Sequence, residues 1–183
     1  IPVINALIDR GVDKILIGGA MAYTFLKAEG FTVGKSLVED SMLSTALEIK
    51  KRAEEKGIAF LLPTDHQVVD SYEPIKGQQV VTKTIPIEFT NIGLVGMDIG
   101  VETVSHFSAA LQDARMIIWN GPMGVFEVEP FAAGTRTVAE ADAALVGRQF
   151  ARQLPNQRGL AGAVRADDGV QFARRHRERH VLR

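Results

Sequence analysis

The segment Ile15-Leu-Ile-Gly-Gly-Ala-Met-Ala-Tyr-Thr-Phe25 decides the fold of this 183-residue chain. A short apolar run, residues 14–17, ends at the pair Gly18 and Gly19, and a helical periodicity then continues to Gly30. The pattern predicts a buried strand, a tight turn and a helix. Two glycines at a strand end let a flat ring or a phosphate approach the backbone, although glycines needed only for the turn would look the same.

The same alternation continues to about residue 144. Helices are predicted at residues 1–8, 40–56, 101–114 and 130–144, and further strands at 58–62, 92–97 and 116–119. Residues 65–91, rich in Val, Thr and Ile but broken by Pro and Gly, are predicted to form short strands and loops. The alternation indicates an α/β fold: an incomplete, doubly wound, Rossmann-like domain with a mainly parallel sheet in three α/β/α layers.

The composition is that of an ordinary globular protein, with 46% apolar and 23% charged residues. The lack of cysteine excludes a disulfide framework and thiolate metal sites. No apolar run approaches the roughly 20 residues of a membrane span, and no signal-peptide pattern opens the chain, so we expect a cytoplasmic protein without a membrane partner. Because the first residue is Ile1 rather than methionine, we expect a fragment.

The last 39 residues differ from the rest of the chain in composition. Residues 1–144 carry 12 basic and 19 acidic side chains, whereas residues 145–183 carry 9 basic side chains, all arginine, and 3 acidic ones. We therefore expect one domain at 1–144 and an atypical Arg-rich tail at 145–183, disordered or read out of frame. A natural basic tail is the alternative. The tail matches no nucleic-acid-binding module, so we expect no nucleic-acid partner.

A second glycine-rich segment, Trp119-Asn-Gly-Pro-Met-Gly-Val-Phe-Glu127, follows the strand predicted at 116–119. Gly and Pro constrain the path of such a loop, its apolar side chains can face a base, and the carboxylate of Glu127 can accept hydrogen bonds from ribose hydroxyls. A surface loop with a solvated glutamate would contain the same residues. The segment therefore indicates a nucleotide site without requiring one.

The order of the motifs resembles the C-terminal, nucleotide-binding domain of the phosphoglycerate kinase family. The resemblance covers about residues 1–144, and its motifs are Gly18-Gly-Ala-Met-Ala-Tyr-Thr-Phe-Leu26, Gly34-Lys-Ser36, Leu62-Pro-Thr-Asp65, Gly96-Met-Asp-Ile-Gly100, Trp119 to Glu127 and Phe131-Ala-Ala-Gly-Thr135. It implies that Gly18, Gly19 and Ala20 lie against adenine, that Gly96 and Met97 line the same pocket, that Asn120 approaches the phosphates, that Pro122, Gly124 and Val125 form the wall beside the base, and that Glu127 holds the ribose.

The resemblance also implies a glycolytic reaction. In this family a phosphoryl group moves between 1,3-bisphosphoglycerate and magnesium-bound ADP, giving 3-phosphoglycerate and ATP, and the parent enzyme is expected to be monomeric. The glycerate substrate would bind to an N-terminal domain that this chain does not contain. The family's lysine-bearing loop and its magnesium-binding aspartate loop are not found either, so we expect no catalytic residue and no metal ligand here. The alternative is a non-catalytic adenine-nucleotide-binding or interaction module with a basic tail.

Three other patterns in the sequence have a simpler structural explanation. Asp65 beside His66 could be half of a metal site, but no further ligand follows at a suitable spacing, so we expect a solvated loop. The segment at residues 34–36 lacks the upstream glycine of a phosphate loop, because position 29 is glutamate. The basic run at residues 50–52 is interpreted as a solvated helix face.

Overall fold

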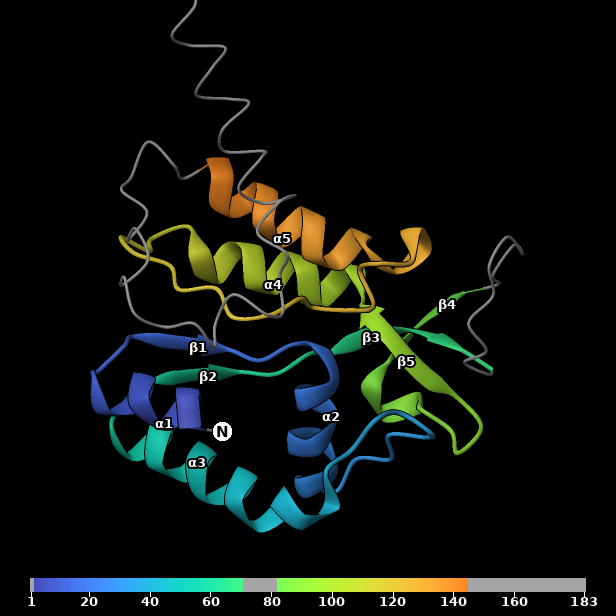
Figure 1. Ribbon diagram of the computed structural model, residues 1–183, viewed down its shortest axis with the longest axis horizontal. Helices are drawn as coiled ribbons and strands as arrows, with labels where there is room; N and C mark the ends of the chain where they lie inside the picture. Colours follow the sequence, from blue (N-terminus) through green and yellow to red (C-terminus); the bar gives the residue numbers. More distant parts are fainter. Residues whose placement is uncertain (1, 71–81, 145–183) are drawn as a thin grey trace, which may run out of the picture.

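The computed structural model describes residues 2–70 and 82–144 (Figure 1). The α-helices are α1 (Pro2–Asp9), α2 (Gly19–Ala28), α3 (Leu43–Glu55), α4 (Val101–Leu111) and α5 (Ala133–Ala144). The strands are β1 (Lys14–Leu16), β2 (Ala59–Leu61), β3 (Asp65–Val69), β4 (Lys83–Pro86) and β5 (Val95–Ile99). Three 3₁₀ turns complete the fold: η1 (Asp40–Met42), η2 (Ile87–Phe89) and η3 (Glu129–Phe131). The Arg-rich tail lies outside the described residues.

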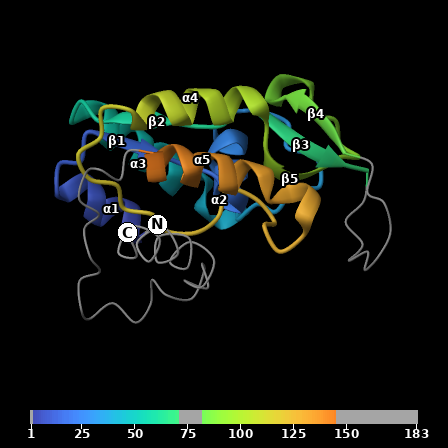
Figure 2. The same ribbon diagram turned by 90° about the horizontal axis from the view of Figure 1, so that it is seen from above.

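The parallel pair formed by β1 and β2 is the middle one of three layers. The two strands pair in register, with Lys14 opposite Ala59 and Leu16 opposite Leu61. The helices α1, α2 and α3 lie on one side of this pair, and α4 and α5 lie on the other (Figures 1 and 2). This arrangement confirms the predicted α/β class and its α/β/α layers.

Both faces of the parallel pair are covered by apolar side chains. Ile15 and Phe60 pack into the α1–α3 cluster, whose buried members are Ile4, Ile8, Ile15, Ile17, Ala22, Phe25, Ala46, Ile49, Ala53 and Ile58. Leu16 and Leu61 point the other way and pack against the α4–α5 cluster, whose buried members are Ile99, Phe107, Leu111, Met123 and Val138. Continuous apolar runs at these strands are therefore explained, since neighbouring residues serve opposite faces.

A second sheet, in the order β4-β3-β5, is antiparallel throughout. The prediction of a mainly parallel sheet did not include this feature. Only residues 62–64 separate β2 from β3, whereas a parallel crossover needs roughly a dozen residues or more. The chain therefore leaves the parallel pair at Pro63 and begins a new sheet, in which a register shift between Gln67 and Val68 marks an irregularity.

The prediction of a strand at residues 116–119 is wrong. In the described part of the chain this segment pairs with no strand. Its side chains still alternate: Ile117 and Trp119 pack against the α4–α5 cluster, while Met116 and Ile118 are 61% and 49% exposed. Alternation records which side of an extended segment is covered, but a strand also needs a hydrogen-bonding neighbour.

Smaller shifts affect three other boundaries. The helix predicted from residue 40 begins as the 3₁₀ turn η1, and the strand predicted at 92–97 lies at Val95–Ile99. Pro130 lies within η3 rather than in the first turn of α5, which starts at Ala133. All three shifts are at element ends, where local preferences are weakest. Each helix in the described ranges is too short or too polar to cross a membrane.

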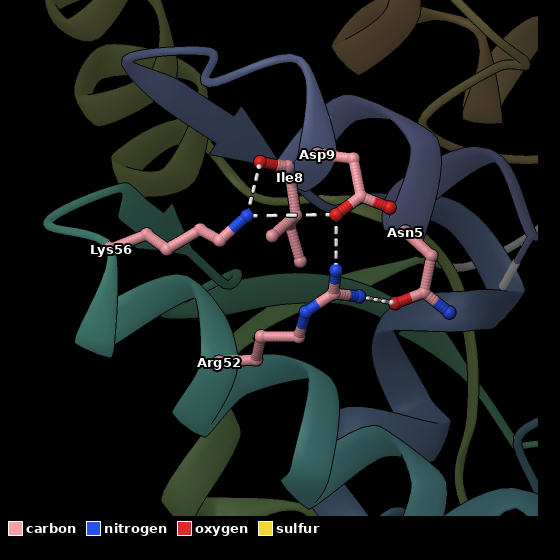
Figure 3. A network of polar contacts seen from close by, with 5 residues as sticks. All are labelled: Asn5, Ile8, Asp9, Arg52 and Lys56. Carbon is pink, nitrogen blue, oxygen red and sulfur yellow. Dashed lines mark hydrogen bonds and ion pairs between the residues drawn. The ribbon is translucent and has the colours of Figure 1, made fainter.

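A polar network fastens α1 to α3 at the surface (Figure 3). Arg52 donates to Asn5 Oδ1 over 2.9 Å and forms an ion pair with Asp9. The Nζ of Lys56 lies 3.5 Å from Asp9 Oδ1 and donates to the carbonyl of Ile8 over 3.3 Å, which places a cation at the C-terminal end of α1. Arg52 thus joins two helices, which the interpretation of residues 50–52 as a solvated face did not anticipate.

Candidate functional site

The glycine pair forms the junction between β1 and α2 and contacts the later glycine-rich loop. Gly19 has a φ of +63°, a left-handed conformation that glycine adopts without strain, and its N–H donates to the carbonyl of Met123 over 3.0 Å. A Cβ on Gly18 would collide with the Met123 side chain. Glycine is therefore required here both for the turn and for the approach of the loop. Ala20 is exposed on the first turn of α2.

The loop at residues 120–127 is held at several points along its length. The N–H of Met123 donates to Thr135 Oγ1 over 3.0 Å, and the N–H of Val125 donates to the carbonyl of Met97 over 2.8 Å. Asn120 and Glu127 are exposed at the two ends of the loop. The backbone of the loop is thus anchored to β5 and α5, while its two polar side chains remain accessible to a ligand.

Gly96 and Met97 lie in β5, on the other side of this loop. The N–H of Gly96 donates to Ser36 Oγ over 2.9 Å, and a Cβ at Gly96 would collide with the phenol of Tyr23. The side chain of Met97 is only 4% exposed and packs with Val69 and Phe131. Any ligand contact from Met97 would therefore come from its backbone rather than from its side chain.

The structure brings most of the sequence-predicted site residues together. Gly18 and Gly19 contact Pro122 and Met123, and a Cβ at Gly19 would lie 2.9 Å from the carbonyl oxygen of Pro122. Met97 in turn holds Val125, so β1, β5 and the loop meet at one place. Asn120 and Glu127 are joined by no contact between them and are related only by lying at opposite ends of the same loop.

Asp98 is a residue of this region to which the sequence analysis gave no role. It is 2% exposed, and its carboxylate accepts the N–H of Gly134 over 2.7 Å and the N–H of Ile99 over 2.9 Å. Burial raises the pKa of Asp98 to about 6, against the opposing effect of the two hydrogen bonds. The signal in the sequence was a charged residue inside an otherwise apolar strand with glycines on both sides.

Asp65 and His66 are buried, so the prediction that they lie in a solvated loop is wrong. Asp65 is 3% exposed and accepts the N–H of Glu102 over 3.0 Å and the N–H of Thr103 over 2.7 Å at the start of α4. This strand residue therefore caps a helix that is distant in sequence. Groups of three or more His, Asp or Glu side chains arranged to hold a metal ion do not occur within the described residues.

His66 forms a buried chain of hydrogen bonds. Its Nδ1 lies 2.9 Å from the Tyr23 hydroxyl, and its Nε2 lies 2.8 Å from Thr90 Oγ1, which itself donates to the carbonyl of Ile87. Because the single Thr90 hydroxyl proton is used on Ile87, Nε2 carries the imidazole proton and Nδ1 accepts from Tyr23. Burial lowers the pKa of His66 to about 4, and it raises the pKa of Tyr23.

The segment at residues 34–36 packs against the strand that carries Gly96. Gly34 has a φ of +61°, and a Cβ there would collide with the carbonyl oxygen of Leu94. The N–H of Lys35 donates to the same carbonyl over 2.7 Å. These contacts, together with the Ser36 hydroxyl on Gly96, explain the segment as a support for the start of β5.

The chain was compared with known proteins in sequence and in structure. Residues 1–151 match the model of the family described as Phosphoglycerate kinase. The phosphoglycerate kinase of Rippkaea orientalis is 47% identical over 148 residues, which cover 81% of this chain and 36% of that protein. The phosphoglycerate kinase of Clostridium botulinum strain Alaska E43 is 49% identical over 141 residues, which cover 77% of this chain and 34% of that protein.

Solved structures give the same result. The structure of phosphoglycerate kinase from Coxiella burnetii superposes with a TM-score of 0.72 at 35% identity, covering 78% of this chain and 36% of that one. The enzyme from Pyrococcus horikoshii superposes with a TM-score of 0.58 at 32% identity, covering 76% of this chain and 35% of that one. The chain thus spans about a third of the length of these relatives. The match over residues 1–151, together with these identities, shows that the chain belongs to the phosphoglycerate kinase family.

Proposed function

We propose that this chain supplies the nucleotide-binding part of a phosphoglycerate kinase, which transfers a phosphoryl group between 1,3-bisphosphoglycerate and ADP to give 3-phosphoglycerate and ATP. In this proposal ADP or ATP lies where the end of β1, the start of α2 and the loop at residues 120–127 meet. The cytoplasmic setting, which is expected from the sequence, and the monomeric parent enzyme, which the family resemblance implies, belong to the same proposal.

One observation carries the proposal: segments about 100 residues apart, both expected to line a nucleotide, are in direct contact. Gly19 donates to the carbonyl of Met123 over 3.0 Å, and Val125 donates to that of Met97 over 2.8 Å. Backbone forms much of this junction, because the missing side chains of Gly18, Gly19 and Gly124 let the segments pack closely on one another. In this proposal a flat base lies against the backbone of the junction, and exposed Asn120 and Glu127 serve phosphate and ribose.

Magnesium enters this proposal only together with the nucleotide. The described residues offer no group of three His, Asp or Glu side chains for a metal ion. The chemistry of this reaction class consists chiefly of positioning and charge neutralisation. We propose that residues 1–183 position the nucleotide but give no measurable turnover by themselves, because they span about a third of the relatives' length.

Calorimetric titration of the purified chain with ADP tests the proposal. We expect saturable one-site binding, and we expect Glu127→Ala to weaken it about tenfold through the loss of hydrogen bonds to ribose. Glu88→Ala is the matched control, because Glu88 is also an exposed glutamate but lies on η2 outside the site. Absent binding in a cooperatively folded chain, or equal effects of the two substitutions, would contradict the proposed site.

A coupled assay for 3-phosphoglycerate kinase activity completes the test. The expected result for the isolated chain is no turnover above background. Robust turnover would show that residues 1–183 hold the whole catalytic site, and it would overturn the division of labour proposed here. A non-catalytic module would also bind nucleotide without turnover. Adding the remaining two thirds of a relative separates the two functions, because activity would appear only if the chain is part of a kinase.

A further inference from the structure

The carboxylate of Asp98 lies at the junction of three segments of the site. One oxygen, Oδ2, accepts the N–H of Gly134 in the first turn of α5 over 2.7 Å. The other, Oδ1, accepts the N–H of Ile99 within β5 over 2.9 Å, and a Cβ on Gly124 would collide with it. The backbone of the loop at residues 120–127 therefore rests directly on this carboxylate.

The loop makes two further hydrogen bonds close to Asp98. Val125 donates to Met97, the residue before Asp98, and Met123 donates to Thr135, the residue after Gly134. The loop is thus bonded to β5 on one side of Asp98 and to α5 on the other. If the carboxylate moved, β5 and α5 would lose the hydrogen bond between Asp98 and Gly134. Because the loop is bonded to both elements, its position would then change as well.

The carboxylate has no ion pair with any described residue. Within the described part of the chain, only backbone N–H groups compensate this nearly fully buried charge, an arrangement that costs free energy and gives no general stabilisation. An apolar residue of similar size would avoid that cost but would leave the N–H of Gly134 without its acceptor. The benefit of an aspartate at this position is the fixed geometry of the three segments.

We infer that Asp98 is a positioning residue that holds the loop at residues 120–127 in place for the nucleotide, by bonding α5 to β5 beneath the loop. This inference rests on the proposed function for the identity of the ligand. Asp98 itself touches no ligand in this arrangement, because Gly124 lies over its carboxylate. Its effect on affinity passes through the backbone of the loop.

The test compares Asp98→Asn with the matched substitution Asp65→Asn. Both replace a buried aspartate that accepts backbone N–H groups at a helix start, but only Asp98 lies beneath the loop. An asparagine keeps the shape and turns an NH₂ group toward one of the backbone donors. We expect Asp98→Asn to weaken ADP binding about tenfold, and Asp65→Asn to change it less than about twofold.

The single tryptophan, Trp119, gives a second readout at the start of the loop. It packs partly buried against the α4–α5 cluster, so loosening of the loop should shift its emission to the red. We expect this shift in Asp98→Asn and not in Asp65→Asn. Unchanged ADP affinity in a folded Asp98→Asn chain overturns the inference. An affinity loss without the Trp119 shift, or one shared by Asp65→Asn, also overturns it.

Two further outcomes are covered. If the unsubstituted chain binds no ADP, the proposed function is rejected, and the Trp119 comparison alone decides whether Asp98 positions the loop. If Asp98→Asn fails to fold, hydrogen exchange on the unsubstituted chain replaces it. Saturation with ADP should then slow exchange of the Gly134 amide but not of the Thr103 amide, since coupling between ligand and junction is reciprocal. Equal exchange with and without ADP at Gly134 overturns the inference.

Discussion

Asp65 and Asp98 are both buried, both lie in strands of the antiparallel sheet, and both accept backbone N–H groups at the start of a helix. Asp65 accepts from Glu102, from the Thr103 backbone and from the Thr103 hydroxyl, all within α4. Asp98 accepts from two segments, β5 and α5, beneath the glycine-rich loop. Each aspartate thus joins its strand to the start of one helix, but only Asp98 also lies against Gly124 of the loop at residues 120–127.

Burial and hydrogen bonding alone therefore do not identify a functional residue. By number of donors Asp65 is the better satisfied group, and its removal should cost more stability. Asp98 is the less well satisfied group, but its contacts reach the proposed site. The expected effects of the two aspartates on stability and on nucleotide binding are therefore in opposite order.

The largest expected effect is on stability, from Asp65→Ala. The substitution leaves the buried N–H of Thr103 and the partly buried N–H of Glu102 without an acceptor, so we expect the free energy of unfolding to fall by about 4 kcal/mol. Urea denaturation followed by circular dichroism measures it. Asp98→Ala should cost less in the same experiment. A larger loss from Asp98→Ala would reverse the comparison.

The second effect concerns acid stability and separates Asp98 from His66. The native pKa of Asp98, about 6, is above that of an unfolded aspartate, so the native state takes up a proton first and Asp98 favours folding as the pH falls. The native pKa of His66, about 4, is below that of unfolded histidine, so the unfolded state takes up a proton first and His66 opposes folding in the same range. The contributions of the two groups to the free energy of unfolding therefore partly cancel between pH 7 and pH 5.

Replacing Asp98 by Asn should remove its contribution and leave the destabilising contribution of His66. We expect the Asp98→Asn chain to lose about 1 kcal/mol more stability than the unsubstituted chain on going from pH 7 to pH 5. Urea unfolding at the two pH values is the measurement. A parallel pH dependence of the two chains would show that Asp98 does not titrate in this window. His66→Gln should shift the balance in the opposite direction.

The smallest effect is expected far from both aspartates, in the network of Figure 3. Arg52→Ala removes an exposed ion pair with Asp9 and a hydrogen bond to Asn5, and such surface contacts contribute little. We expect a loss of about 0.5 kcal/mol in the free energy of unfolding, measured by urea denaturation, and no change in ADP affinity. A loss as large as that from Asp65→Ala would mean that docking of α1 limits the stability of the whole domain.

Much of the fold could be predicted because its signals are local. The strand, glycine turn and helix at residues 14–28 were recognised from periodicity and two glycines, and the structure has them within a few residues. The strand predicted at 116–119 is wrong because the alternation of side chains is a local property, whereas the pairing of a strand depends on a distant segment. The antiparallel sheet was missed because the directions of β3 and β5 depend on how the chain turns between them.

The candidate site divides in the same way. Gly18, Gly19 and the loop ending at Glu127 could be found from composition and motif order, because turns and close backbone approach require particular residue types. Asp98, the cap formed by Asp65 and the bonds of Tyr23 to His66 could not be found in that way. Each joins residues from about 35 to about 45 positions apart, and nothing local in the chain indicates such a partner.

Residue types and their order were therefore enough to predict the α/β class, the family and the segments that carry the proposed nucleotide site. Only the tertiary structure decided which buried carboxylate supports the loop and which caps a distant helix. The physical reason is that burial and hydrogen bonding belong to pairs of groups in space. The sequence shows that a residue is an aspartate, but its role depends on the groups that folding brings into contact with it.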